Sequence, residues 1–236
     1  AYLQTRAALI GEQSMKVAKA GVPAGAKITY APMPYQLEYG TSHISIVDGS
    51  GNALAMTTTI EDAWGSRQMV NRGKLDASGK PILGGFLLNN QLTDFSFAPT
   101  DSEGKPIANR VQAGKRPRSS MSPTLVFDKA TGQLVASVGS PGGALIIHYT
   151  AKTLYGMLNW GLDPQAAINL PNFGSLNGPT ILEEKRFPAS TVEALKARGH
   201  EIREINMTSG LQGIQKTKDG FVGGADPRRE GVVRGD

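Results

Sequence analysis

The stretch TSHISIVDGSGNALAMTTTI, residues 41–60, decides the fold of this 236-residue chain. Its first part, SHISIVD, alternates in polarity, and its second part, NALAMTTTI, is rich in residues that favour strands. The GSG between the two parts is a turn signal. The pattern predicts a β-hairpin over residues 42–60, which the chain enters just after Gly40.

The expected hairpin places two threonines opposite each other. If residues 49–51 form the loop, Asp48 pairs with Asn52, and counting outward brings Thr41 opposite Thr59 to within about two residues. Directly opposed strand residues have Cβ atoms about 5 Å apart, which permits a hydrogen bond between two hydroxyls. Threonines are also common in strands without any chemical role. The hairpin alone therefore leaves both interpretations open.

The rest of the chain predicts clusters of strands flanked by a few helices. Helices are expected at residues 2–19, at about 144–160, after the cap signature Asp163-Pro164, and at 188–199, where Gly199 ends the helix. Strands are expected in a second hairpin (SPTLVFD and QLVASVG), around TKDG, and within 84–97 before an acidic turn. Residues 20–40, 61–84 and 98–118 are expected as a connector and two loops. This order favours one layered domain with prominent antiparallel pairing.

Composition narrows the classes of function. The formal net charge is +5, but the basic residues are scattered, and the only tight cluster is Lys115, Arg116 and Arg118. No nucleic-acid-binding motif accompanies that cluster, so nucleic acid is not an expected partner. Cys is absent, which excludes disulfides and thiolate catalysis. No apolar run approaches the roughly 20 residues that cross a bilayer, so no membrane span is expected.

Motifs of several other chemistries are missing from the sequence. His43, His148 and His200 lie far apart without metal-ligand spacing, and we expect them to be surface or hydrogen-bonded core residues. There is no Gly-x-Ser-x-Gly motif, and the GSPGG at 139–143 lacks the Lys-Ser/Thr of a phosphate loop. We therefore expect no metal and no cofactor.

Five motifs in sequence order carry a family resemblance. TSHISIVDGSGNALAMTTTIE, LLNNQLTDFS, KRPRSSMSPT, GSPGG and ADPRR together resemble the small subunit of gamma-glutamyltranspeptidases over residues 41–230. Residues 1–40 resemble the tail of that family's large subunit. The resemblance implies two parts, 1–40 and 41–236, and an α+β fold: the four-layer αββα sandwich of N-terminal-nucleophile hydrolases.

The resemblance also implies a mechanism. Thr41 attacks the carbonyl of Gly40, and the chain is cleaved between these two residues. The freed amine of Thr41 then serves as the base for its own hydroxyl, which Thr59 holds by a hydrogen bond. The enzyme would accept the γ-glutamyl group of glutathione-like amides as an ester and pass it to water or to an amino acid.

The family's other site positions fall on matching residues of this chain. Gln91 and Asp94 match positions that bind the substrate ammonium, and Ser119 and Ser120 match the hydroxyls that bind its carboxylate. Glu61 is a further acceptor at a position where better-known members carry Asn. Gly142 and Gly143 match the oxyanion hole, although Ala144-Leu145 follows where many members carry Ser-Arg. Singly, an acidic turn cap, adjacent loop serines or a Pro-Gly turn would each be unremarkable.

Alternatives and partners complete the expectations. A related glutaryl or cephalosporin acylase shares the nucleophile, and an inactive or unprocessed fragment is the non-catalytic alternative. The large subunit of the same precursor is the expected protein partner, and a periplasmic or secreted location follows from the family. The loop 61–84 is longer and 96–118 shorter than in the best-known members, which suggests a more open site. Trp64 either lines an acceptor pocket or packs on the surface.

Overall fold

The computed structural model describes residues 1–27, 30–33 and 40–235. Its helices are α1 (Tyr2–Ala7), α2 (Ile146–Trp160), α3 (Pro164–Asn169) and α4 (Ala189–Ala197), with short 3-10 turns at Gln91–Asp94 and Gly143–Leu145. The first strands are β1 (Thr41–Val47), β2 (Ala53–Thr59), β3 (Met69–Leu75), β4 (Pro81–Leu87), β5 (Thr124–Phe127) and β6 (Leu134–Gly139). The remaining strands are β7 (Phe173–Ser175), β8 (Thr180–Glu183), β9 (Ile202–Ile205), β10 (Gln212–Thr217) and β11 (Gly220–Ala225).

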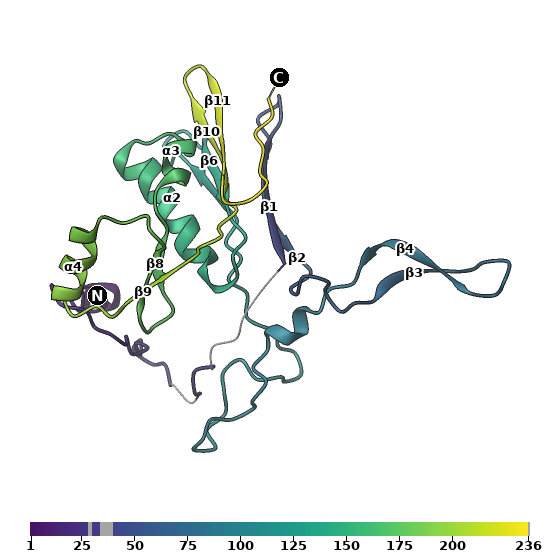
Figure 1. Cartoon of the computed structure of the whole chain (residues 1–236), viewed down its shortest axis with the longest axis horizontal. Coiled ribbons are helices and arrows are strands. Elements are labelled where there is room, and N and C mark those ends of the chain that lie inside the picture. Colours follow the sequence, from purple (N-terminus) through teal and green to yellow (C-terminus); the bar gives the residue numbers. More distant parts are fainter. Residues whose placement is uncertain (28–29, 34–39, 236) are drawn as a thin grey trace.

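Three layers form the main body of the described chain (Figure 1). A four-stranded antiparallel sheet in the order β11-β10-β6-β5 is the middle layer. The β1–β2 hairpin packs on one face of this sheet, and α2 and α3 pack on the other. An α+β architecture is thus confirmed, with two packed β-layers and one helical layer.

The central strand β6 is buried on both of its faces because it lies between these layers. Ala136 and Val138 point to the helical side and belong to the core cluster with Tyr149 and Met157 of α2. Ser137 points to the opposite side, where its hydroxyl is 2.9 Å from Ser45 Oγ. The alternation is what a strand period of two requires.

The predicted hairpin at residues 42–60 is confirmed, and its register pairs Thr41 with Thr59 and Val47 with Ala53. The turn follows a side-chain pattern that recurs later in the chain. Asp48 Oδ1 accepts hydrogen bonds from the N–H groups of Ser50 (2.9 Å) and Asn52 (2.8 Å). Gly51 completes the turn at φ +83°, a left-handed conformation that glycine adopts without strain.

Most of the other elements also lie where the sequence predicts them. The β5–β6 and β10–β11 hairpins are present, α2 follows the Gly-rich stretch, and Asp163 Oδ1 caps α3 by accepting the N–H of Ala166. The helix α4 ends two residues before Gly199, whose φ is +80°. The sheet of β7, β8 and β9 was not predicted; its strands have three or four residues each, too short for a clear period.

The prediction of a helix over residues 2–19 is wrong beyond Ala7. No residue of α1 is buried, and Leu3 and Ile10 are 79% and 82% exposed. A short helix is marginal in water when its apolar face has nothing to pack against. The apolar spacing of this segment therefore does not produce a long helix here.

The prediction of a loop at residues 61–84 is also wrong, because β3 and β4 form a hairpin that projects from the main body (Figure 1). Its turn repeats the pattern of the first hairpin: Asp76 Oδ1 accepts the N–H groups of Ser78 and Lys80, and Gly79 has φ +80°. The strand expected within 84–97 ends at Leu87, and its Phe86 is 63% exposed. Residues 98–118 form the expected loop, apart from isolated bridges.

The connector at residues 20–40 lies partly outside the described residues, at 28–29 and 34–39. The division of the chain at residue 40 stays a prediction. Within the described ranges, no helix is long and apolar enough to cross a membrane.

Candidate active site

Thr59 links the expected nucleophile to the bond that it is expected to cleave. Its hydroxyl donates to the carbonyl oxygen of Gly40 at 3.0 Å and accepts the hydroxyl of Thr41 at 3.1 Å. The backbone N–H of Glu61 donates to the same oxygen at 2.8 Å. One donor and two acceptor positions are thus all used, which fixes the hydroxyl between Thr41 and the Gly40–Thr41 peptide.

The backbone at Gly40 requires glycine. Its φ is +77°, in the left-handed region, and a Cβ would lie 2.7 Å from the carbonyl oxygens of both Glu61 and Asp62. The backbone of Gly40 thus lies against the segment that follows β2 and leaves no room for a side chain between them.

A small cavity collects most of the expected site residues. Its volume is about 20 Å³, room for about one water molecule. The residues that line it come from β1, β2, the segment just after β2, the 3-10 turn after β4, the loop before β5 and the start of α2. They are Thr41, Thr59, Glu61, Gln91, Asp94, Ser119, Met121 and Ile146.

Glu61 lies buried beside Thr59 in a conformation unusual for its type. Its φ is +73°, which is uncommon for a residue with a long side chain. The carboxylate oxygen Oε2 accepts the amide of Asn90 and lies 2.8 Å from Thr93 Oγ1. The backbone conformation and the two partners together direct the carboxylate to the cavity.

Asp94 is the second carboxylate of the cavity. It is 5% exposed and accepts a hydrogen bond from the side-chain amide of Gln91. Burial raises the pKa of Asp94, while the Gln91 hydrogen bond and the positive charge of Arg118 oppose that rise. A cationic ligand group would favour the charged form of this carboxylate.

The expected serines and glycines are only partly brought into the cavity. Ser119 lines it, and its Oγ accepts the N–H of Met121 at 3.3 Å. Ser120, Gly142 and Gly143 do not line it. Gly142 has φ +136° and its Cα faces the ring of Tyr149, while Gly143 begins the 3-10 turn that leads into α2. The amide groups of this turn lie at the start of a 15-residue helix, where partial positive charge accumulates.

The sequence did not predict a role for three residues that bond to the lining of the cavity without lining it themselves: Asn90, Thr93 and Asn109. Asn90 and Thr93 hold Glu61, and Asn109 ties two loops together. The amide of Asn109 donates to the backbone oxygen of Asp94 at 2.7 Å, and its oxygen accepts the N–H of Arg118 at 3.1 Å. Asn90 and Thr93 were visible in the run LLNNQLTD, but Asn109 stands in a loop without a pattern.

His43 is a buried core residue, which is one of the two roles that the sequence predicts for the histidines. Its ring lies between β1–β2 and Gly139 of β6, with Nδ1 2.8 Å from Thr57 Oγ1 and Nε2 3.2 Å from Ser45 Oγ. Burial lowers the pKa of His43 to about 4. The ring packs between the β1–β2 hairpin and β6 and does not line the cavity.

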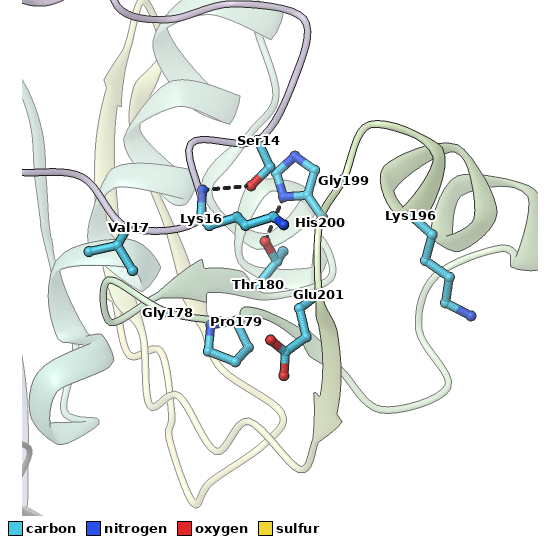
Figure 2. A pocket seen from close by; sticks show the side chains of 10 residues that line it. All are labelled: Ser14, Lys16, Val17, Gly178, Pro179, Thr180, Lys196, Gly199, His200 and Glu201. Atoms are coloured by element: carbon cyan, nitrogen blue, oxygen red, sulfur yellow. Dashed lines mark hydrogen bonds between the residues drawn. The ribbon is translucent and has the colours of Figure 1, made fainter.

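A larger cavity of about 340 Å³ lies elsewhere, between residues 14–17 and the α4–β9 region (Figure 2). Figure 2 shows Lys16, Lys196 and Glu201 around it, and His200 Nδ1 lies 2.7 Å from Thr180 Oγ1. None of the expected catalytic residues lines it. Size alone therefore does not identify the site, and the expected site residues gather at the small cavity beside Thr41. Trp64 is 67% exposed and lines neither cavity.

Comparisons with known proteins agree on one family. The family model described as Gamma-glutamyltranspeptidase matches residues 1–235. The chain is 33% identical to the glutathione hydrolase proenzyme of Bacillus subtilis over 99% of its length and 38% of the relative's. It is 34% identical to the proenzyme of Escherichia coli over 83% of its length and 32% of the relative's. The chain thus spans about a third of the length of these curated relatives.

Solved structures support the same conclusion. A mutant gamma-glutamyltranspeptidase of Helicobacter pylori is 32% identical, with a TM-score of 0.66 over 79% of this chain and 99% of that one. A cephalosporin acylase from Bacillus halodurans has a TM-score of 0.71 over 99% of this chain and 38% of that one, but at 22% identity it shows the fold alone. The expected fold of N-terminal-nucleophile hydrolases is confirmed, and the chain belongs to the gamma-glutamyltranspeptidase family.

Proposed function

We propose that this chain carries the nucleophile of a γ-glutamyl transferase and hydrolase, and that Thr41 first cleaves its own bond to Gly40. The position of the Thr59 hydroxyl carries the proposal. It contacts both the Thr41 hydroxyl and the Gly40 carbonyl oxygen. A donor on a carbonyl oxygen stabilises the negative charge that develops there when a nucleophile attacks.

The self-cleavage has two steps. The Thr41 hydroxyl oxygen attacks the Gly40 carbonyl carbon, the carbon–nitrogen bond breaks, and the hydroxyl proton passes to the Thr41 nitrogen. An ester then joins Gly40 to the side chain of Thr41. Water hydrolyses this ester, which leaves a carboxylate on Gly40 and a free amine and hydroxyl on Thr41.

The transfer reaction uses the groups that cleavage releases. The free amine of Thr41 accepts the proton of its own hydroxyl as that oxygen attacks the γ-carbonyl of the substrate. The proton passes to the leaving amine, and the γ-glutamyl group remains as an ester on Thr41. Water or the amine of an amino acid then attacks the ester and restores the hydroxyl.

The two carboxylates of the cavity favour a γ-glutamyl group over a glutaryl group. Glu61 and Asp94 both line the cavity next to Thr41, and in the proposal they bind the α-ammonium that a glutaryl group lacks. Ser119 and Ser120 bind the α-carboxylate. Gly142 and Gly143 stabilise the oxyanion through their N–H groups.

The cavity in the uncleaved chain is too small for this substrate. A volume of about 20 Å³ accommodates about one water molecule. The backbone of Gly40 lies against Glu61 and Asp62, and Glu61 lines the cavity. We infer that separation of Gly40 from Thr41 opens the site, so that the zymogen binds no substrate before cleavage.

The rest of the precursor is the proposed partner. The outer face of the β1–β2 hairpin is apolar and exposed, and Ile46 on it is 49% exposed. A contiguous apolar patch on the surface marks an interaction site, so in the proposal another part of the precursor covers this face. The other residues of the face are Ile44, Leu54 and Met56. A periplasmic or secreted location belongs to the same proposal.

The test is a Thr41→Ala variant of the full precursor, with Thr58→Ala as the control on the opposite face of β2. We expect Thr41→Ala to abolish both cleavage after Gly40, followed by intact-mass spectrometry, and turnover of a γ-glutamyl anilide. Thr58→Ala should cleave and turn over normally. Cleavage of Thr41→Ala at the wild-type rate, or a wild-type preference for a glutaryl anilide, would contradict the proposal.

A further inference from the structure

We propose that Asp226 is a positioning residue that holds the Ser140–Gly143 segment in place for the reaction. The inference rests on the proposed function in so far as Gly142 and Gly143 form the oxyanion hole. It adds a role for the ADPRR motif, residues 225–229, which the site itself does not use. The connection is a series of hydrogen bonds that runs from Asp226 through residues 207–211 to Ser140.

Asp226 is 1% exposed, and both of its carboxylate oxygens are fully partnered. Oδ2 accepts the hydroxyl of Ser209 at 2.5 Å and the N–H of Leu211 at 3.1 Å. Oδ1 accepts the N–H of Arg228 at 3.0 Å and its guanidinium at 3.1 Å. One oxygen thus holds the segment before β10, and the other holds the cation of the motif.

The segment held by Oδ2 supports the Gly-rich loop directly. Between Ser209 and Leu211 lies Gly210, whose N–H donates to Ser140 Oγ at 3.3 Å. A Cβ on Gly210 would lie 2.6 Å from the ring of Pro141, so backbone and ring are in close contact. Ser140 in turn donates to the carbonyl oxygen of Pro141 at 2.6 Å. Movement of Gly210 would therefore reach Pro141 through both a hydrogen bond and a packing contact.

The loop is confined from the other side by α2. A Cβ on Gly142 would lie 2.4 Å from Cε2 of the Tyr149 ring, so the ring is in close contact with the glycine. Tyr149 is itself buried in the core. Residues 140–142 are thus held between Gly210 and Tyr149. A shift of the loop would move the two N–H groups relative to Thr41, and misplacement by about 1 Å can cost on the order of 100-fold in rate.

The competing explanation is that the charged cluster of Asp226, Arg228 and Glu183 only stabilises the fold, and Glu183 offers a matched control for it. Glu183 is 7% exposed and binds the same Arg228 side chain, with two nitrogen–oxygen distances of 2.7 Å. It also accepts the N–H of Asn172, and no hydrogen bond joins it to residues 207–211 in the part of the chain that the structure describes. Both carboxylates stabilise the cluster, but of the two only Asp226 bonds directly to the segment that supports the loop. Glu183 reaches Ser209 only indirectly, through Asn172, whose side-chain amide donates to Ser209 Oγ at 2.8 Å.

The experiment compares Asp226→Asn, Ser140→Ala and Glu183→Gln with wild type in the full precursor. In Asp226→Asn, one acceptor oxygen becomes a donor, so either the Leu211 N–H or Arg228 loses its partner. Ser140→Ala breaks the same path at its other end. Steady-state turnover of a γ-glutamyl anilide gives kcat and KM separately, and hydrogen–deuterium exchange reports the amides of residues 140–145.

We expect Asp226→Asn and Ser140→Ala each to lower kcat about 10- to 100-fold with KM changed less than about twofold. The double variant should lose less than the product of the two single effects, because both act through one path. Exchange at residues 140–145 should be faster in these variants and unchanged in Glu183→Gln. The exchange measurement needs no turnover, so it tests the positioning even if the proposed activity fails.

Unchanged exchange at residues 140–145 in Asp226→Asn would overturn the inference. The same holds if Glu183→Gln reproduces the loss of kcat at an equal folded fraction, because the effect would then belong to the stability of the cluster. If Asp226→Asn does not fold, Ser140→Ala with faster exchange and lower kcat supports the path, and Ser140→Ala with neither overturns it.

Discussion

Thr59 lies directly opposite Thr41 on the neighbouring strand, and the two hydroxyl oxygens are 3.1 Å apart. The same Thr59 oxygen is 3.0 Å from the carbonyl oxygen of Gly40. In the uncleaved chain, one side chain therefore orients the proposed nucleophile and polarises the proposed scissile carbonyl. The proposed cleavage would release the second contact and leave Thr59 with Thr41 and the N–H of Glu61.

Thr59→Val should slow self-cleavage about 100- to 1000-fold, because a donor to the developing oxyanion is lost while the shape of the side chain is kept. The rate is measured by the appearance of a chain that begins at Thr41 on intact-mass spectrometry. Thr57→Val is a useful comparison, since Thr57 contacts His43 and not Gly40. Equal rates for Thr59→Val and wild type would remove Thr59 from the cleavage step.

Gly40→Ala should both strain the backbone and displace it. A left-handed φ costs a non-glycine residue about 1–2 kcal/mol, and the new Cβ would meet two carbonyl oxygens at 2.7 Å. Gly51→Ala has a similar φ of +83° but no atom within 4 Å of its Cβ, so it isolates the strain. We expect cleavage to slow in Gly40→Ala only, as followed by the loss of intact precursor on gels.

Glu61→Gln should raise KM for a γ-glutamyl anilide about 10-fold and leave KM for a glutaryl anilide unchanged. A charge-assisted hydrogen bond to the α-ammonium contributes about 1.5–3 kcal/mol, and the glutaryl group has no such partner. The mature enzyme is used, so that any effect on cleavage is excluded. A parallel rise in KM for both substrates would assign Glu61 to the shape of the cavity.

The pairing of Thr41 with Thr59 could be predicted from the sequence because the turn that sets it is local. Asp48 and Gly51 carry that turn, and a strand period of two does the rest. Asp76 and Gly79 carry the same turn chemistry, but the sequence did not predict the β3–β4 hairpin from it. The strand β3 (MVNRGKL) has a run of polar residues and β4 (PILGGFL) is apolar but interrupted by two glycines, so neither shows the alternation that would have marked it as a strand.

The support of the site could not be predicted in this way. Asn90 reaches Glu61 across 29 residues, and Ser209 reaches Asp226 across 17, both between loops without a period. Such contacts depend on how distant segments pack, which local patterns do not encode. The helix expected at residues 2–19 failed for a related reason, since its apolar spacing meets no partner.

Acidification should destabilise the protein through His43. Burial holds the folded pKa of His43 at about 4, below its ordinary value of 6.5. Between these values the unfolded state binds the proton and the folded state does not, so stability present above pH 6.5 is lost as the pH falls toward 4. The loss amounts to about 3 kcal/mol. Denaturant midpoints of wild type and His43→Gln should converge from pH 7 to 4, because only the wild type loses the contribution of His43. The contribution of His148, whose pKa is also lowered by burial, is the same in both proteins and cancels.

Lys152→Met should be neutral or stabilising at pH 7, although it removes a buried charge that makes two hydrogen bonds. Lys152 Nζ donates to the carbonyl oxygens of Ile168 and Leu170, but Arg228 donates to the same two oxygens and would keep them partnered. Burial lowers the pKa of Lys152 to about 7, so its charged form is disfavoured in the fold.

The sign of the pH dependence distinguishes this case from His43. Between pH 7 and 10.5 the unfolded state keeps the Lys152 proton that the folded state releases, so the wild type gains stability as the pH rises. The Met variant lacks this gain. The stability of wild type relative to Lys152→Met should therefore increase from pH 7 to 10 in denaturant unfolding. A wild type that weakens relative to the variant over this range would mean that the buried amine stays charged and paired.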